Sequence, residues 1–179
     1  MKLIKIVSIL LTVVIIFLAA RYVLYHVSYR LLYQETIEKY SSEYNIDEYL
    51  MMAIINSESS FNKNAVSSAG AKGLMQLTDS TAQSIAKSMG NKSFTVEDLY
   101  DPETNIKMGA WYLNNLKQEF SSTELVLAAY NAGRGNVAKW LGNSIISNDG
   151  KDYKNIPFAE TKNYIASVLN KEKMYRFLY

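Results

Sequence analysis

The sequence predicts a mainly α-helical domain that follows a single apolar N-terminal helix. Three observations support this fold class. Apolar residues recur at three- and four-residue spacing along most of the chain, residues that cap helices stand before several of these stretches, and no stretch alternates as a half-buried strand does. With 179 residues, 49% of them hydrophobic, the chain is long enough for one folded domain and a short appendage.

The N-terminal segment has the properties of a membrane-spanning helix. Residues 6–20 carry no charge, and a helix over residues 3–24 would be about 33 Å long, enough for a hydrocarbon core of about 30 Å. Lys2 and Lys5 predict a cytoplasmic N-terminus and an extracytoplasmic remainder. A cleaved secretory signal is the alternative, although Leu18 stands where a cleavage site prefers a small residue.

These features predict three parts. We expect a transmembrane signal anchor over residues 1–25, a short linker over 26–34 and a folded domain over 35–179. The expected location is the cell membrane, in a single pass, with the domain outside the cytoplasm; cleavage of the signal would make it a secreted protein.

Composition excludes several kinds of chemistry. Cysteine is absent and His26 is the only histidine, which excludes disulfides, thiolate zinc sites and lipid attachment through an N-terminal cysteine, and disfavours a Ser-His-Asp triad. The formal charge of +2 comes from the three basic residues in the first 25 positions, so the folded part shows no basic excess for nucleic acid. We expect no metal, no cofactor and no nucleic-acid partner.

Capping signals place the helices of the folded domain. Asn45 and Glu48 are spaced as a capping box, and Asp101-Pro102 combines an N-cap residue with proline at the first helical position. Residues 60–77 are rich in glycine, serine and asparagine and predict a structured loop. The expected helices cover residues 35–44, 45–59, 79–89, 123–132 and 136–141, with one starting at Asp101-Pro102 and one at Pro157.

Glu58 is the residue most suggestive of catalysis. Met51, Ile54, Ile55 and Glu58 stand at i, i+3, i+4 and i+7, so the carboxylate shares the apolar face of its helix. Burial raises the pKa of a carboxyl, which suits a general acid. A glutamate at a helix end that turns toward water is the alternative on spacing alone.

Four motifs then follow one another in order. Residues 57–82 read SESSFNKNAVSSAGAKGLMQLTDSTA; the others are N-x-x-x-G-x-x-Y-L from Asn105, A-A-Y-N-A-G over 128–133 and P-x-x-E-T-x-x-Y over 157–164. Together they resemble the soluble lytic transglycosylases, a family of lysozyme-like enzymes that cut bacterial peptidoglycan. The resemblance covers about residues 36–175 and implies a lysozyme-like (goose-type) helical domain. Arg134 stands where the family often has glycine.

The resemblance also implies roles for individual residues. Glu58 would be the catalytic acid/base, and a second carboxylate would be unnecessary because the N-acetyl group of the substrate stabilises the transition state. The implied substrate-binding residues are Ser59, Met75, Gln76, Tyr130, Asn131, Glu160 and Tyr164. The sequence alone leaves structural roles open for these residues: core packing for Met75 and Tyr164, helix-end contacts for Ser59, Tyr130 and Asn131, and helix-dipole stabilisation for Glu160.

The implied function is that of a peptidoglycan lytic transglycosylase. It would cleave the β-1,4 bond between N-acetylmuramic acid and N-acetylglucosamine and form a 1,6-anhydromuramyl end. The alternatives are an N-acetylmuramidase, which would use water, and a wall-binding module without catalysis. The expected partners are peptidoglycan glycan strands and, through the N-terminal helix, the membrane; a role in a wall-spanning apparatus stays open.

Overall fold

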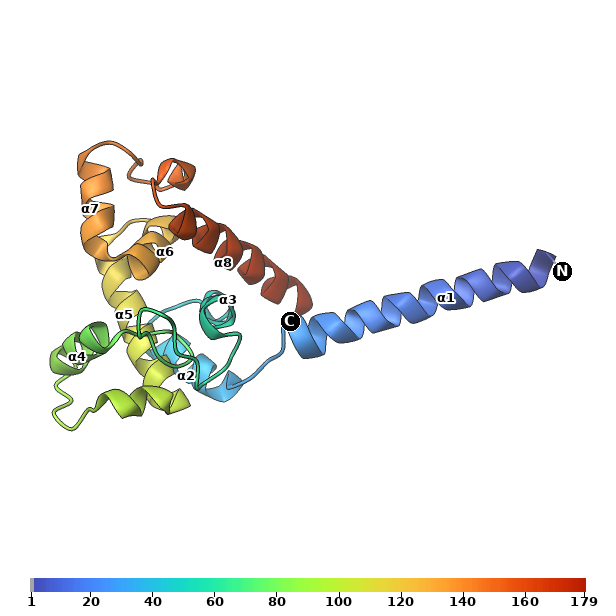
Figure 1. Cartoon of the computed structure of the whole chain (residues 1–179), viewed down its shortest axis with the longest axis horizontal. Helices are drawn as coiled ribbons and strands as arrows, with labels where there is room; N and C mark the ends of the chain where they lie inside the picture. Colours follow the sequence, from blue (N-terminus) through green and yellow to red (C-terminus); the bar gives the residue numbers. More distant parts are fainter. Residues whose placement is uncertain (1) are drawn as a thin grey trace.

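The N-terminal helix stands apart from the folded domain. The computed structural model describes residues 2–179, with side-chain surroundings from residue 4 onward. Helix α1 (Lys2–Val23) runs into one π-helical turn, η1 (Leu24–Ser28), and projects away from all other helices (Figure 1). The stretch Ile4–Ser28 is long and apolar enough to cross a membrane, and its most apolar window is not buried. A signal sequence would share these properties, so the choice of an uncleaved anchor stays a prediction.

The rest of the described chain is helical, as predicted. Between residues 2 and 179 no strand is present, and pairing is limited to isolated bridges of Lys72 with Val66 and Leu77. The helices are α2 (Gln34–Glu43), α3 (Glu48–Ser59), α4 (Asp79–Ser88), η2 (Val96–Tyr100), α5 (Pro102–Glu119), α6 (Thr123–Ala132), α7 (Arg134–Gly142), η3 (Tyr153–Asn155) and α8 (Ala159–Leu178).

One predicted helix start is confirmed and one is wrong. Asp101 caps α5, since its carboxylate accepts the Thr104 N–H at 2.8 Å. For α3 the predicted capping pair of Asn45 and Glu48 does not form. Asp47 caps that helix by accepting the Leu50 N–H at 3.0 Å, while Asn45 has a positive φ of 51° in the preceding turn. A short carboxylate in extended backbone reaches the first free N–H groups of a helix, which a residue inside a left-handed turn does not.

Two other boundaries differ from the prediction. Helix α8 begins at Ala159 and not at Pro157, because Pro157 lies in a bend and the backbone of Phe158, the N-cap residue, is extended. Helix α7 is longer than the predicted 136–141: it starts directly after Gly133, whose φ of 87° turns the chain sharply between α6 and α7. A left-handed φ of this kind favours glycine.

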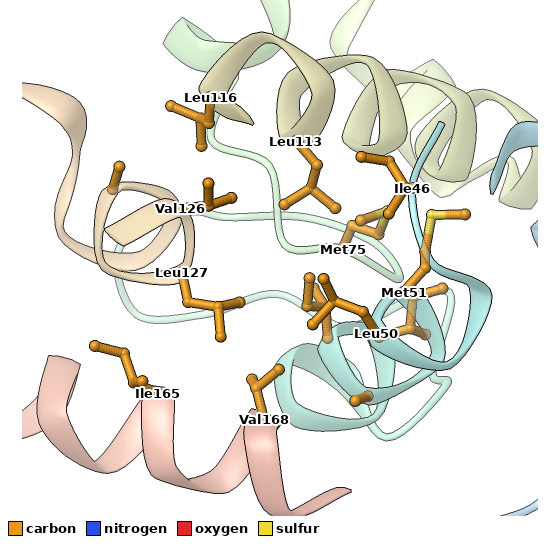
Figure 2. Packing of buried hydrophobic residues seen from close by; sticks show 14 of the residues in the cluster. Ile46, Leu50, Met51, Met75, Leu113, Leu116, Val126, Leu127, Ile165 and Val168 are labelled. Atoms are coloured by element: carbon orange, nitrogen blue, oxygen red, sulfur yellow. The ribbon is translucent and has the colours of Figure 1, made fainter. Parts of the chain in front are cut away.

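Helix α3 lies at the centre of the core. Residues 50–56 are all buried, and α3 packs against α8 and α2. Figure 2 shows Leu50 and Met51 in one buried cluster with Leu113 of α5 and Val168 of α8. Burying one such side chain contributes about 1.5–3 kcal/mol, so this cluster stabilises the domain and fixes where α3 ends. A smaller cluster lies beneath α4 and η2.

The segment predicted as a linker is packed onto the domain. Leu31, Leu32 and Tyr33 are partly buried against the main core, and the Asn56 amide donates to the Ser28 carbonyl at 2.8 Å. Residues 26–34 are therefore seated on the folded domain, and the division at 25 and 34 remains a prediction.

Candidate active site

Glu58 lies in the last turn of α3, where that helix opens into a groove. The groove has a volume of about 360 Å³, and Glu58, Gln76, Tyr130, Asn131 and Glu160 line it together. They come from α3, the loop after it, α6 and α8. Polar side chains from four separate segments thus converge on one groove around a single inward-facing carboxyl.

The loop after α3 is attached to α5 by a buried asparagine. The Asn105 side chain accepts the Met75 N–H at 2.8 Å and donates to the carbonyls of Leu99 at 2.8 Å and Lys72 at 3.1 Å. Gly73 lies so close that a Cβ there would fall 2.1 Å from the Asn105 amide nitrogen. One side chain therefore holds the loop at two points and fixes its path beside α3.

The same face of α5 receives Met75 and supports Tyr130. The Met75 side chain fills space that Gly109 leaves free, since a Cβ at Gly109 would lie 2.2 Å from the Met75 sulfur. The Tyr130 hydroxyl donates to the Met75 carbonyl at 2.7 Å, and its ring packs at 5.6 Å against Tyr112. Asn105, Gly109 and Tyr112 follow one another at helical spacing, which explains the N-x-x-x-G-x-x-Y pattern physically.

The surroundings of Glu58 favour its protonated form. Its pKa is raised from 4.5 to about 7. Burial is the largest cause and the nearby Glu160 carboxylate adds to it, while the Tyr164 hydroxyl and the Lys171 ammonium act in the opposite direction. The buried Tyr164 hydroxyl has no other hydrogen-bond partner among the described residues and lies close enough to Glu58 to favour its ionised form. A carboxyl with a pKa near neutral pH can both give and accept a proton there.

Comparison with known proteins identifies the family that the sequence motifs resemble. The family model described as "Transglycosylase SLT domain" matches residues 35–153, which is more than half of the chain. This chain belongs to the transglycosylase SLT domain family. The match ends before α8, which nevertheless carries Glu160, Tyr164 and Lys171 of the groove and its surroundings.

Relatives and solved structures of this SLT domain are lytic transglycosylases by name. The soluble lytic murein transglycosylase of Escherichia coli K12 is 38% identical over 150 residues, covering 82% of this chain and 23% of the relative. Membrane-bound lytic murein transglycosylase C of Serratia proteamaculans is 33% identical over 166 residues, covering 80% of this chain and 46% of the relative. This chain thus spans less than half the length of either relative.

The fold agrees with these relatives. The 70 kDa soluble lytic transglycosylase SLT70 of Escherichia coli superposes with a TM-score of 0.76 at 37% identity, over 83% of this chain and 25% of that one. An inactive glutamate-to-glutamine mutant of lytic transglycosylase Slt from Pseudomonas aeruginosa gives 0.75 at 32% identity, over 82% and 24%. The predicted lysozyme-like helical fold is confirmed.

The SLT domain brings some of the predicted site residues to the groove and places others behind it. Glu58, Gln76, Tyr130, Asn131 and Glu160 line the groove; Ser59, Met75 and Tyr164 are not among its described lining residues. The Ser59 hydroxyl donates to the Leu74 carbonyl at 2.8 Å, and the Met75 side chain is fully buried in the core. Of the two roles open for Met75, the structure therefore shows core packing for its side chain.

Two of the groove residues are held by identifiable contacts. The side-chain amide oxygen (Oδ1) of Asn131 accepts a hydrogen bond from the buried Thr161 hydroxyl at 2.8 Å, which links α6 to α8. Gln76 adopts a positive φ of 48° and donates to the carbonyls of Gly73 at 2.9 Å and Ala65 at 3.1 Å. These two hydrogen bonds stabilise the left-handed backbone of Gln76. They also hold its side-chain amide in the wall of the groove.

Three contributors to the site were not expected from sequence. Tyr112 lines the groove, Asn105 supports its floor, and Lys171 lies near Glu58 from α8. Lys171 stands seven residues after Tyr164, two helical turns along the same face, and this spacing was the available signal. Arg134 is paired with Glu119 at 3.0 Å and donates to Asn115 at 2.6 Å, so its charge is largely engaged within the SLT domain.

The raised pKa of Glu58 predicts how its replacement changes stability with pH. The unfolded chain releases this proton near pH 4.5 and the folded chain near pH 7, so ionisation of wild-type Glu58 lowers the free energy of unfolding as pH rises through this window. Glu58→Gln removes that cost. The difference in free energy of unfolding between the variant and wild type should therefore shift in favour of the variant by about 2–3 kcal/mol from pH 4 to pH 8.

Denaturant unfolding of wild type and variant at these two pH values measures the difference. Glu160→Gln is a second variant: it removes the carboxylate that helps to raise the pKa of Glu58, so it should make the loss of stability of the otherwise wild-type chain over this window smaller. An equal effect of Glu58→Gln at both pH values would mean that the carboxyl is not desolvated.

Proposed function

We propose that this chain is a peptidoglycan lytic transglycosylase that cleaves the β-1,4 bond between N-acetylmuramic acid and N-acetylglucosamine. The observation that carries the proposal is the Glu58 carboxyl, which lies in the wall of a polar groove with its pKa raised to about 7. Membership of the SLT domain family and relatives named lytic murein transglycosylases support the same substrate.

The chemistry needs one carboxyl that acts twice. Protonated Glu58 gives its proton to the glycosidic oxygen as the bond from that oxygen to the anomeric carbon breaks. The carbonyl oxygen of the substrate's N-acetyl group stabilises the positive charge at the anomeric carbon. Ionised Glu58 then takes the proton of the muramyl 6-hydroxyl as the oxygen of that hydroxyl bonds to the anomeric carbon. The product is a 1,6-anhydromuramyl end, and no water is consumed.

The groove residues divide into those that contact sugar and those that position Glu58. We assign substrate contact to Gln76, Tyr130, Asn131 and Glu160, because these side chains line the groove. Ser59 and Met75 support the wall from behind through their contacts to the loop and to α5. Tyr164, with a buried hydroxyl beside Glu58, steadies the ionised form of the carboxyl between the two proton transfers.

We further propose that α1 anchors the enzyme in the cell membrane in a single pass. Its length and composition fit a membrane span, and one relative is named a membrane-bound lytic transglycosylase. Lys2 and Lys5 favour a cytoplasmic N-terminus, which places the groove outside the cytoplasm, where peptidoglycan lies.

Product analysis tests the enzymatic proposal. The full chain, reconstituted in lipid vesicles, is incubated with purified peptidoglycan, and the released fragments are weighed by mass spectrometry. We expect muropeptides one water lighter than hydrolysis products and without a reducing end. Fragments with reducing ends would identify a muramidase instead, and binding without release of fragments would identify a wall-binding module.

A further inference from the structure

The C-terminus of the chain packs against the base of the N-terminal helix. The Tyr25 hydroxyl donates to the Leu178 carbonyl at 3.2 Å, and the Tyr179 hydroxyl donates to the Tyr29 carbonyl at 2.9 Å. Figure 1 shows the end of α8 beside the point where α1 leaves the folded domain. The C-terminal end of the chain and the base of the N-terminal helix therefore meet at one place.

This meeting point is continuous with the core of the folded domain. The rings of Tyr25 and Tyr179 pack edge to face at 5.4 Å, and those of Tyr29 and Tyr175 do so at 5.2 Å. Fully buried Tyr175 in turn accepts a hydrogen bond from the Asn56 amide of α3 at 2.9 Å. A chain of aromatic contacts thus joins η1 to the end of α8 and, through it, to the central helix.

The length of α1 sets the depth of this contact in a bilayer. Residues 3–24 of the helix span about 33 Å, so they fill a hydrocarbon core of about 30 Å and leave Tyr25 at the headgroup level. Interfacial tyrosines commonly occupy that level. Leu178 and Tyr179 contact Tyr25 and Tyr29 directly, so the last turn of α8 lies at the same level.

The last turn of α8 also exposes an aromatic side chain. Phe177 is 81% exposed, more than Phe158 (46%), which stands just before the first residue of the same helix. Burying a phenylalanine side chain is worth about 1.5–3 kcal/mol, so its exposure beside a membrane span points to lipid as its neighbour. Lys173, one turn earlier, is exposed and suits the phosphates of anionic headgroups.

We propose that the C-terminal turn of α8, residues 174–179, is a second membrane contact, with Phe177 in the interfacial region of the bilayer. The proposal rests on the proposed membrane anchoring by α1. The partner in this contact is the lipid surface around α1. The contact would hold the catalytic domain against the membrane. A flexible linker, in contrast, would let the domain change its orientation freely.

Single cysteine variants test the contact, because the natural chain has no cysteine. The full chain carrying Phe177→Cys is labelled with the environment-sensitive fluorophore NBD and reconstituted into vesicles of phosphatidylethanolamine and phosphatidylglycerol. We expect blue-shifted emission and several-fold stronger quenching by lipids with a spin label near the headgroup than for the matched control Phe158→Cys. Thermal unfolding of both labelled variants checks that each is folded.

A third variant separates this proposal from the anchoring on which it rests. Ile15→Cys places the label in the middle of α1, and we expect quenching by lipids with a spin label deep in the acyl chain. Loss of that signal, or release of the protein by alkaline washing, would overturn the anchoring. Quenching of Ile15→Cys with emission from Phe177→Cys equal to that from Phe158→Cys would overturn the membrane contact alone.

Discussion

Glu58→Gln is expected to lose roughly 10²–10⁴-fold of the rate of peptidoglycan cleavage while the fold is kept. Glutamine preserves the shape of the side chain and its polar contacts, but an amide neither donates a proton to the glycosidic oxygen nor takes one from the muramyl hydroxyl. Initial rates of release of soluble muropeptides, measured with the reconstituted full chain at neutral pH, give the effect.

Two other carboxylates serve as matched controls. Asp79 is the first residue of α4 and is paired with Lys72, so Asp79→Asn should change the rate least. Glu160 lines the groove and raises the pKa of Glu58, so Glu160→Gln should cause an intermediate loss. A loss with either control as large as that of Glu58→Gln would contradict the single-carboxyl mechanism and favour a two-carboxylate hydrolase.

The second large effect concerns the loop beneath the groove. Gly73→Ala is expected to destabilise the protein by roughly 3–5 kcal/mol and to lower activity with it. Gly73 has a φ of 77°, and an added Cβ would lie 2.1 Å from the Asn105 amide nitrogen and 2.3 Å from the Leu99 carbonyl oxygen. The new methyl group would break the hydrogen bonds by which Asn105 holds the loop.

Gly70→Ala isolates the backbone part of that cost. Gly70 lies in the same loop with a φ of 79°, but a Cβ there would meet nothing within 4 Å. Its replacement should cost only about 1–2 kcal/mol, the penalty of a left-handed backbone for alanine. Denaturant unfolding of the two variants gives the difference, and equal losses would show that Asn105 does not depend on the space beside Gly73.

The sequence predicted those parts of the site that depend on local spacing. Apolar residues every three or four positions placed Glu58 on the inward face of α3, and the structure shows the carboxyl partly buried there with a raised pKa. The Asp101-Pro102 helix start is likewise a local signal, since the capping side chain and its N–H partner are three residues apart. Such features need no knowledge of how distant segments meet.

Features that depend on distant contacts were not predicted. Lys171 lies near Glu58 only because α8 packs along α3, and Asn105 reaches Met75 across 30 residues of chain. The wrong cap at Asn45 has a similar origin: burial of Ile46 fixes the turn before α3 and leaves Asp47 to cap that helix. Periodicity shows which face of a helix is buried but does not show which segment covers it.

The length of helix α8 bears on how far from the membrane the groove lies. Tyr164, beside Glu58, stands 14 residues before Leu178, which contacts the base of α1, and these residues span about 21 Å of helix. Under the membrane contact proposed above, the far end of α8 lies at the bilayer, and α8 then acts as a rigid spacer of fixed length. The groove would then reach only the glycan strands that pass close to the membrane, and a longer or shorter α8 would select a different layer of the wall.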